Sequence, residues 1–407
     1  MSPTTIPGNL ILQSPTANDP LLDLNTQPSL DLQFATSKTL NDRVSGQNLI
    51  TFSRSTTGTY VDSNGIIQTA AIDAPRFDHD PTTNASLGLL IEESRTNFLT
   101  NSEHLDTGWL YQGSMAAPTT TTVKTPDGDL DARLFTSSGG RVRQDKIPAA
   151  AIYTLSVYYK PNTDTTLQLF LFNSGSQANV TFDTTNPSSP TVTSGSGVMV
   201  AAGDGWFRAS VTTSAATDGT TIESMIYTDS GYLWGAQLEA GAFPTSYIPT
   251  SGSSVPRAAD VASITGSNFS RWYEKSEGTV FVDSSALGLN TINRMVYITD
   301  GSTSNSLGIA ETLSLTQFLA YTGGVAQANL SFAQTGLSKK TFAYAVNDAA
   351  FTADGNSALT DTSVTLPGLD RMDLNSRLGA NPLNGHIARL TYYPYRLPDA
   401  TLQEITS

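Results

Sequence analysis

Apolar and polar residues alternate with a period of two along the middle of the chain. The clearest runs are 153–159, 167–172, 207–211 and 232–238. In the second run, leucines occupy one face of the expected strand, and Gln168, Phe170 and Phe172 occupy the other. Clusters of Gly, Pro, Asn and Asp separate these runs. Short alternating strands between turn signals predict a β-sandwich over residues 102–250.

A second set of strand-like runs follows between residues 257 and 407. The candidates are 278–283, 295–299, 315–321, 340–347, 370–378 and 386–393. The stretch Leu397–Ile405 has helical spacing, with Asp399 near its start, and predicts a short terminal helix. No heptad pattern is present that would encode a coiled-coil stalk. The sequence therefore predicts a second sandwich over residues 257–407.

The N-terminal third has two parts. Residues 1–30 contain five prolines, which lack a backbone donor and interrupt helices and central strands. They predict an extended attachment arm, and a disordered tail is an equally good interpretation. Residues 31–101 form a small β-rich region, with a hairpin turn at Ser63-Asn64-Gly65 and a strand over 87–91. We expect this region to bind the particle and to mediate oligomerisation. Residues 246–256, rich in Ser, Gly and Pro, predict a linker.

The composition supports an all-β fold and narrows the choice of partners. Only 14% of the 407 residues are charged, the net charge is −14, and there is no cysteine. A chain of this charge repels nucleic acid and anionic membranes, and without cysteine it forms neither disulfides nor zinc–thiolate sites. No apolar run is long enough to insert into a membrane, and the first residues lack the features of a secretory signal. We therefore expect release by cell lysis.

Three stretches resemble phage structural proteins described as head spike, head fibre or tail fibre proteins. The first is Thr51–Val61 (TFSRSTTGTYV), continued by Ala74–Asp78 (APRFD) and Gly88–Asn97 (GLLIEESRTN). The second is Gly231–Gly241 (GYLWGAQLEAG) with Pro244–Thr250 (PTSYIPT). The third is Leu383–Pro394 (LNGHIARLTYYP) with Arg396–Ala400 (RLPDA).

This resemblance implies an architecture, a location and a role. The second stretch looks like the closing strand of a jelly roll akin to carbohydrate-binding modules. The third looks like the end of a laminin-G or concanavalin-A-like sandwich. A subunit on the virion surface is implied, with other virion proteins of capsid or tail as partners and host cell-surface polysaccharide as ligand. Multivalent display of weak sugar sites also favours a homo-oligomer.

The sequence lacks the motifs of common hydrolases and nucleotide-binding enzymes, including Gly-x-Ser-x-Gly and His-Glu-x-x-His. Glu92 and Glu93 are adjacent in an expected strand, so they point to opposite faces and cannot form a glycosidase pair. His79, His104 and His386 are better explained as turn or packing residues than as catalytic groups. We therefore expect that this protein is not an enzyme. A decoration or adaptor protein without a ligand and a polysaccharide depolymerase are the alternatives.

Two groups of residues are candidates for ligand contact. Exposed aromatic rings stack on the apolar faces of sugars, and the candidates are Trp109, Tyr111, Trp206, Trp272 and Tyr273. Trp206 is out of phase with the apolar positions that follow it, which favours a ring facing outward. Packing in the core is nevertheless the better explanation for each of the five residues. Asp127, Asp129 and Asp131 alternate in a way that suits a structural Ca²⁺, although a plain acidic turn is the better explanation, because Ser138 stands where an EF-hand loop has Glu.

Overall fold

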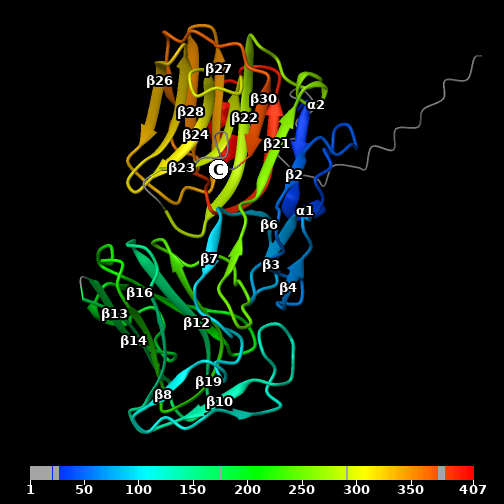
Figure 1. Cartoon of the computed structure of the whole chain (residues 1–407). Coiled ribbons are helices and arrows are strands. Elements are labelled where there is room, and N and C mark those ends of the chain that lie inside the picture. Colours follow the sequence, from blue (N-terminus) through cyan, green and yellow to red (C-terminus); the bar gives the residue numbers. More distant parts are fainter. Residues whose placement is uncertain (1–20, 22–26, 175, 290–291, 375–380) are drawn as a thin grey trace, which may run out of the picture.

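The computed structural model describes residues 21, 27–174, 176–289, 292–374 and 381–407. Two β-sandwiches lie one above the other and are joined by a narrow neck (Figure 1). All paired strands within their sheets are antiparallel. The all-β fold with two sandwiches predicted from the alternating runs is confirmed. None of the described helices is long and apolar enough to cross a membrane.

The lower lobe, which we call the inserted sandwich, comprises residues 98–254. Its first sheet contains, in spatial order, β16 (Ser196–Ala201), β17 (Phe207–Thr212), β12 (Tyr153–Pro161), β19 (Ser230–Ala240), β10 (Arg133–Thr136) and β9 (Thr119–Thr120). Its second sheet contains β15 (Thr191–Ser194), β14 (Ser176–Asp183), β13 (Thr166–Asn173), β18 (Ile222–Tyr227), β11 (Arg141–Lys146) and β8 (Leu110–Gln112). The alternating leucines of β13 face the core between the sheets.

The upper lobe, which we call the composite sandwich, uses both ends of the chain. One sheet runs β29 (Leu359–Asp361), β28 (Asp348–Ala353), β27 (Lys339–Ala345), β22 (Glu277–Ala286), β31 (Gly385–Tyr393), β6 (Ser86–Ile91) and β5 (Arg76–His79), with β1 (Leu30–Leu32) also on β31. The other runs β2 (Thr51–Ser53), β21 (Val261–Thr265), β30 (Arg371–Leu374), β23 (Ile292–Thr299), β24 (Ser306–Thr312), β25 (Thr316–Thr322) and β26 (Val325–Phe332).

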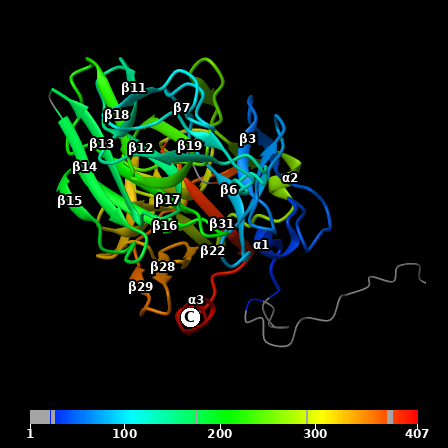
Figure 2. The ribbon, with the colours of Figure 1, turned by 90° about the horizontal axis from the view of Figure 1, so that it is seen from below.

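Three helices accompany the composite sandwich. Two of them, α1 (Phe34–Ser37) and α2 (Ser267–Ser270), are single turns. The third, α3 (Asp399–Thr406), is the predicted terminal helix, and it packs Leu402 and Ile405 onto the outer side of the first sheet (Figure 2). Leu21 joins this cluster, where Tyr393 donates a hydrogen bond to its carbonyl at 2.8 Å. The rest of the proline-rich arm up to residue 26 lies outside the described residues.

The β-rich region over residues 31–101 does not form a sheet of its own apart from one hairpin. That hairpin pairs β3 (Gly58–Val61) with β4 (Ile67–Ala70) around the predicted Asn64-Gly65 turn. The neighbouring β2 instead pairs with β21, while β6 pairs with β31. Strand alternation indicates where strands lie but not which distant strand they meet, so the division expected near residue 101 differs from the observed strand pairing.

The neck consists of two antiparallel strands, β7 (Arg95–Asn97) and β20 (Val255–Arg257). The chain enters the inserted sandwich through the first and leaves it through the second, so the two ends of that lobe are adjacent. The segment predicted as a linker is partly built into the structure, because Tyr247, Ile248 and Thr250 are buried, while Pro249, residues 251–254 and Pro256 are exposed. The inserted sandwich is therefore a domain insertion between two parts of the composite sandwich.

The strand pairing gives a test of this composite architecture. A fragment of residues 257–407 lacks β1, β2, β5 and β6, which leaves the pairing edges of β21 and β31 open and removes Leu30, Leu32 and Leu89 from the core. We expect it to be unfolded or aggregated, while residues 98–254 fold alone, as circular dichroism and thermal melting would show. Cooperative unfolding of the 257–407 fragment would contradict the composite sandwich.

Candidate functional site

Five ionic side chains are buried together where the neck meets the composite sandwich, and we call them the junction network. They are Arg54, Arg76, Glu92, Arg257 and Asp260. Arg54 follows β2, Arg76 lies in β5, Glu92 follows β6, Arg257 ends β20 and Asp260 precedes β21. None is more than 6% exposed. Because an unpaired buried charge costs several kcal/mol, these groups must satisfy one another.

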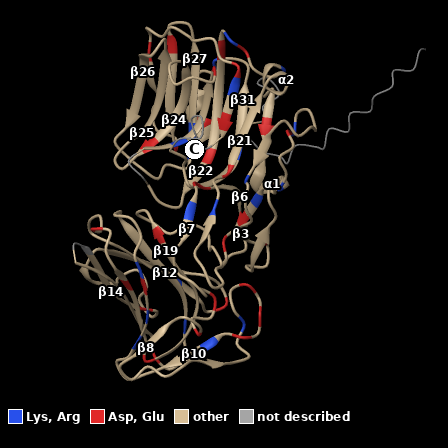
Figure 3. Ribbon diagram, in the orientation of Figure 1, with Lys and Arg blue, Asp and Glu red and all other residues tan. Residues whose placement is uncertain are grey.

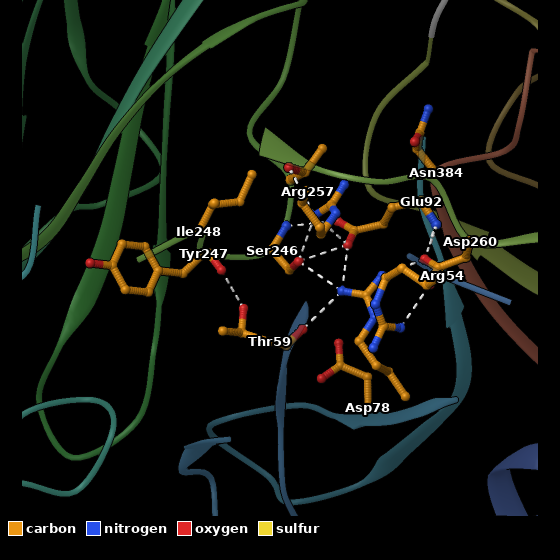
Figure 4. Close-up of polar contacts among 12 residues, drawn as sticks. Arg54, Thr59, Asp78, Glu92, Ser246, Tyr247, Ile248, Arg257, Asp260 and Asn384 are labelled. Carbon is orange, nitrogen blue, oxygen red and sulfur yellow. Dashed lines mark hydrogen bonds and ion pairs between the residues drawn. The ribbon is translucent and has the colours of Figure 1, made fainter. Parts of the chain in front are cut away.

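The geometry of the junction network meets that demand (Figure 4). Asp260 accepts from Arg54 at 3.0 Å and from Arg76 at 2.5 Å through its two carboxylate oxygens. Glu92 Oε2 lies 2.7 Å from both Arg76 and Arg257. The three arginines also donate to backbone carbonyls, those of Thr56, Ala71, Thr59 and Glu93. The buried Nε atoms of Arg76 and Arg257 have no hydrogen-bond partner among the described residues.

Glu92 is ionised in this setting. Burial alone raises the pKa of its carboxyl group, but the charges of Arg257 and Arg76, with hydrogen bonds from Ser246, lower the pKa to about 2. The Ser246 amide and hydroxyl each donate to this carboxylate at 2.7 Å. All four carboxylate oxygens of the network are occupied, so the site supports structure and offers no free acid or base.

The network also holds the exit from the inserted sandwich. Ser246 belongs to the segment after β19, and its neighbour Tyr247 accepts a hydrogen bond from Thr59 of the β3–β4 hairpin at 2.5 Å. In Figure 4 the Tyr247 ring points away from the charges, toward the inserted sandwich. There its hydroxyl group contacts Ser102 Oγ at 2.7 Å. Asn97 in the neck donates to the carbonyls of Ala236 and Ile248. The two lobes are thus fixed to each other by polar contacts.

The first sheet of the inserted sandwich is covered on part of its outer face, while Val198 and Val200 of β16 remain exposed. Trp206, Trp234 and Tyr247 cluster there beneath Ile67 of the β3–β4 hairpin and Val123 of the loop before β10. Trp206 is 1% exposed and donates through Nε1 to the Lys124 carbonyl at 2.9 Å. The alternation placed Trp206 outside the sheet, as observed, but it did not reveal that a loop and a hairpin cover this face.

The predicted sugar-binding aromatic residues lie in different parts of the fold. Trp109 and Trp272 are buried, at 5% and 4% exposed, so the expectation of an exposed ring is not met there or at Trp206. Tyr111 is half-buried and donates to the carbonyls of Leu105 and Asp106. Tyr273 is half-buried and lines a cleft on the composite sandwich. The structure does not bring these five residues together.

The acidic turn has structural partners. Thr125 donates to Asp127 at 2.6 Å, and Asp131 lies 3.2 Å from His104 Nε2. Within the described residues, no three carboxylate, His or Cys groups are arranged to hold a metal ion. Ca²⁺ at Asp127, Asp129 and Asp131 therefore stays a prediction beside the plain acidic turn. The other two histidines are buried: His79 contacts the Val61 carbonyl, and His386 contacts Asp78 at 2.8 Å.

The second sheet of the inserted sandwich has an open outer face, at the left edge of the molecule in Figure 2. Strand register fixes which side chains share it. Tyr227 of β18 lies between Arg141 of β11 and Gln168 of β13. In the next rows, Phe170 lies between Met225 and Asn179, and Phe172 between Glu223 and Gln177. We call Arg141, Gln168, Phe170, Phe172, Asn179 and Tyr227 the aromatic face.

The aromatic face presents ring surface beside polar groups. Phe172 is 40% exposed, Phe170 and Tyr227 are half-buried, and the two phenylalanine rings pack edge to face at 6.0 Å. Arg141 lies over the Tyr227 ring at 5.7 Å. Gln168 donates to Asn179 at 2.8 Å, and no described residue occupies the Gln168 carbonyl or the Asn179 amino group. Both groups are therefore available to a ligand.

The sequence contained a pattern that indicates the aromatic face, but none of the predicted sugar-binding residues belongs to it. Phe170 and Phe172 alternate with the core leucines of the same strand, so they fall on the polar side of a half-buried sheet. Large aromatic side chains on a solvent-facing side expose apolar surface to water, which is unfavourable. Such exposed apolar surface often marks a binding site. The three tryptophans that were predicted to bind sugar, Trp109, Trp206 and Trp272, are instead buried.

The junction network predicts a large and pH-dependent effect of Glu92→Gln. Neutralising Glu92 leaves Arg257 buried without its ion-pair partner and Arg76 with Asp260 alone, so we expect the free energy of unfolding at pH 7 to fall by about 3–5 kcal/mol in urea titrations. The pKa of Glu92 lies below its ordinary value of 4.5. The difference in free energy of unfolding between the native chain and Glu92→Gln is thus complete above about pH 4.5 and is lost as the pH falls toward 2.

An exposed ion pair provides the control for this prediction. Asp348 pairs with Arg396 at 2.9 Å, but its side chain is 49% exposed. We expect Asp348→Asn to lower the free energy of unfolding by no more than about 1 kcal/mol. Equal effects of the two substitutions, or a Glu92→Gln effect that does not shrink below pH 4.5, would show that the network is not a stabilising element.

Comparisons with known proteins give no family assignment. No family model and no curated protein matches the sequence. Among solved structures, the CBM40 module of Ruminococcus gnavus IT-sialidase is similar at a TM-score of 0.28 and 18% identity, covering 33% of this chain and 84% of that one.

Two further similar structures belong to larger proteins. NanB sialidase from Streptococcus pneumoniae has a TM-score of 0.29 at 16% identity, covering 35% of this chain and 26% of that one. The receptor binding domain of botulinum neurotoxin mosaic serotype C/D has a TM-score of 0.27 at 11% identity, covering 36% and 39%. Scores this low carry no argument about function, which must come from the site itself.

Proposed function

We propose that this protein binds polysaccharide reversibly through the aromatic face of the inserted sandwich. The observation that carries the proposal is the exposed pair Phe170 and Phe172, which lie on a solvated sheet face in register with amide side chains. On the opposite outer face of the same sandwich, Ile67 and Val123 cover the aromatic cluster of Trp206, Trp234 and Tyr247, whereas nothing described covers Phe170 and Phe172 in this way.

The residues of this face match the chemistry of sugars. The C–H side of a pyranose ring packs on aromatic rings, while its hydroxyl groups require donors and acceptors at the edge. Gln168 supplies an acceptor, Asn179 a donor, and Arg141 further donors from its place over Tyr227. The side chains stand on central strands of a sheet, so little conformational entropy is lost when a ligand binds.

The carboxylates beside the aromatic face favour binding over hydrolysis. Asp145 and Glu223 are the nearest acids in register, on β11 and β18. Both are engaged by Arg143, at 2.6 Å and 2.9 Å. A glycosidase needs one carboxyl held protonated and a second one free to act as base or nucleophile. Two carboxylates sharing one guanidinium do not meet that requirement.

We also propose that the chain is an adhesin on the surface of a phage particle. The support is the resemblance of the three sequence stretches to head spike and fibre proteins. In this setting the N-terminal arm, residues 1–30, attaches to other virion proteins. Several copies would together raise the avidity of a weak sugar site. A decoration protein without a ligand is the alternative, and it would make the aromatic face functionless.

The double variant Phe170→Ala/Phe172→Ala tests the binding site. If each ring loses about 60 Å² of apolar contact with sugar, the cost is about 1.5 kcal/mol per ring, so we expect retention on immobilised polysaccharides to fall at least about tenfold. The native chain should release no new reducing ends during the same incubation. A panel of dextran, alginate, pectin and hyaluronan, with extracted bacterial capsules, provides the substrates.

Val325→Ala is the matched control, because Val325 is 63% exposed on β26 of the other lobe. It should leave retention unchanged, and thermal melting should show that all variants remain folded. Equal retention by the double variant and the native chain would refute the aromatic face. New reducing ends from the native chain would support the depolymerase alternative instead.

Immunogold electron microscopy tests the virion proposal separately. Antibodies raised against the inserted sandwich should label the outside of intact particles from a lysate of cells that produce this protein. A chain without residues 1–30 should be soluble and absent from the particles. Particles that carry no label, or that incorporate the truncated chain normally, would contradict this location or the role of the arm.

A further inference from the structure

A cleft of about 680 Å³ opens on the composite sandwich and is lined in part by α2. Figure 1 shows α2 at the top of the upper lobe, far from β13 in the lower lobe. Its walls come from α2 and the residues after it, from the turn between β23 and β24, and from the residues that lead into β30. Its lining includes Phe269, Ser270, Tyr273, Lys275 and Asp370. A volume of this size suits a ligand of one or two sugar units.

The floor of the cleft is aromatic and rigid. Phe269 is buried, and its ring lies 4.5 Å from that of Tyr273 at an angle of 32°. Tyr344 stacks behind Tyr273 at 6.5 Å, and Tyr392 lies at 5.9 Å. Tyr273 is itself only half-buried, so part of its ring borders the cleft in an orientation that its neighbours fix. A preformed ring of this kind binds a flat apolar surface at low entropic cost.

The charged side chains around the floor differ in whether they already have hydrogen-bond or ion-pair partners within the protein. Asp300 accepts from the Ser302 amide and from Asn305, and Arg371 pairs with Asp373 at 2.5 Å. Asp370 and Lys275, by contrast, are exposed, and their side chains make no hydrogen bond or ion pair with the described part of the chain. One free carboxylate and one free ammonium balance in charge, which favours a neutral ligand rich in hydroxyl groups.

We propose that this cleft is a second saccharide site, which binds one neutral sugar unit with its ring on Tyr273 and its hydroxyl groups on Asp370 and Lys275. The proposal rests on the proposed function, because it assigns the second lobe to the same class of ligand. The two sites stand on lobes that the junction network fixes to each other. A polysaccharide long enough to reach both therefore binds more tightly than to either one alone.

The experiment uses the full chain on a printed array of neutral and acidic mono- and oligosaccharides. Ser270→Trp fills the cleft from its exposed rim, and Asp370→Asn removes the carboxylate without changing its shape. Ser331→Trp places the same bulk on exposed β26, outside the cleft, as the control. We expect both cleft variants to lose at least about tenfold in affinity for neutral sugars that Phe170→Ala/Phe172→Ala still binds, while Ser331→Trp loses nothing.

The outcomes separate this proposal from the aromatic face. If Ser270→Trp and Asp370→Asn bind every sugar as Ser331→Trp does, while the phenylalanine double variant loses binding, the cleft is refuted and the aromatic face stands. If only the cleft variants lose binding, the cleft stands and the aromatic face is refuted. A native chain that binds no sugar on the array overturns both.

Discussion

Three arginines and two carboxylates meet in the interior at the point where three segments of the chain converge, and the arrangement of the molecule depends on their pairing. Charges held away from water are stable only with partners in good geometry. Arg54 and Arg76 come from the N-terminal third, Arg257 and Asp260 from the segment after the inserted sandwich, and Ser246 ties in that sandwich itself. Figure 3 shows Lys, Arg, Asp and Glu scattered over both lobes. The junction network buries five such residues together where the lobes join.

This junction explains why the two proposed binding surfaces are held at a fixed position relative to each other. The β3–β4 hairpin reaches from the composite sandwich to the inserted one, where Ile67 covers one sheet and Thr59 holds Tyr247. The other sheet keeps its outer face open. A flexible linker would let two weak sites act independently, whereas a paired-strand neck supported by buried ion pairs makes their separation constant. Constant separation is what allows two weak contacts to cooperate on one polymer.

Local patterns in the sequence predicted the strands well and their partners poorly. The alternation of Leu167, Leu169 and Leu171 identified β13 and its core face, because side-chain direction follows directly from strand geometry. Pairing of β2 with β21 joins residues about 210 positions apart, and no local pattern encodes it. The phase of Trp206 was also correct, yet its burial depends on Val123 and Ile67 from other segments. The stretch TFSRSTTGTYV resembles phage structural proteins, and its arginine, Arg54, belongs to the junction network.

The most direct test of this account is a crystal structure of the full chain soaked with the polysaccharide fragment that it retains. We expect density for a sugar ring packed on Phe170 and Phe172, with hydroxyl groups within hydrogen-bonding distance of Gln168 and Asn179, and with no movement of the two lobes relative to each other. Density only at other surfaces, with the aromatic face bare at saturating ligand, would contradict the central claim.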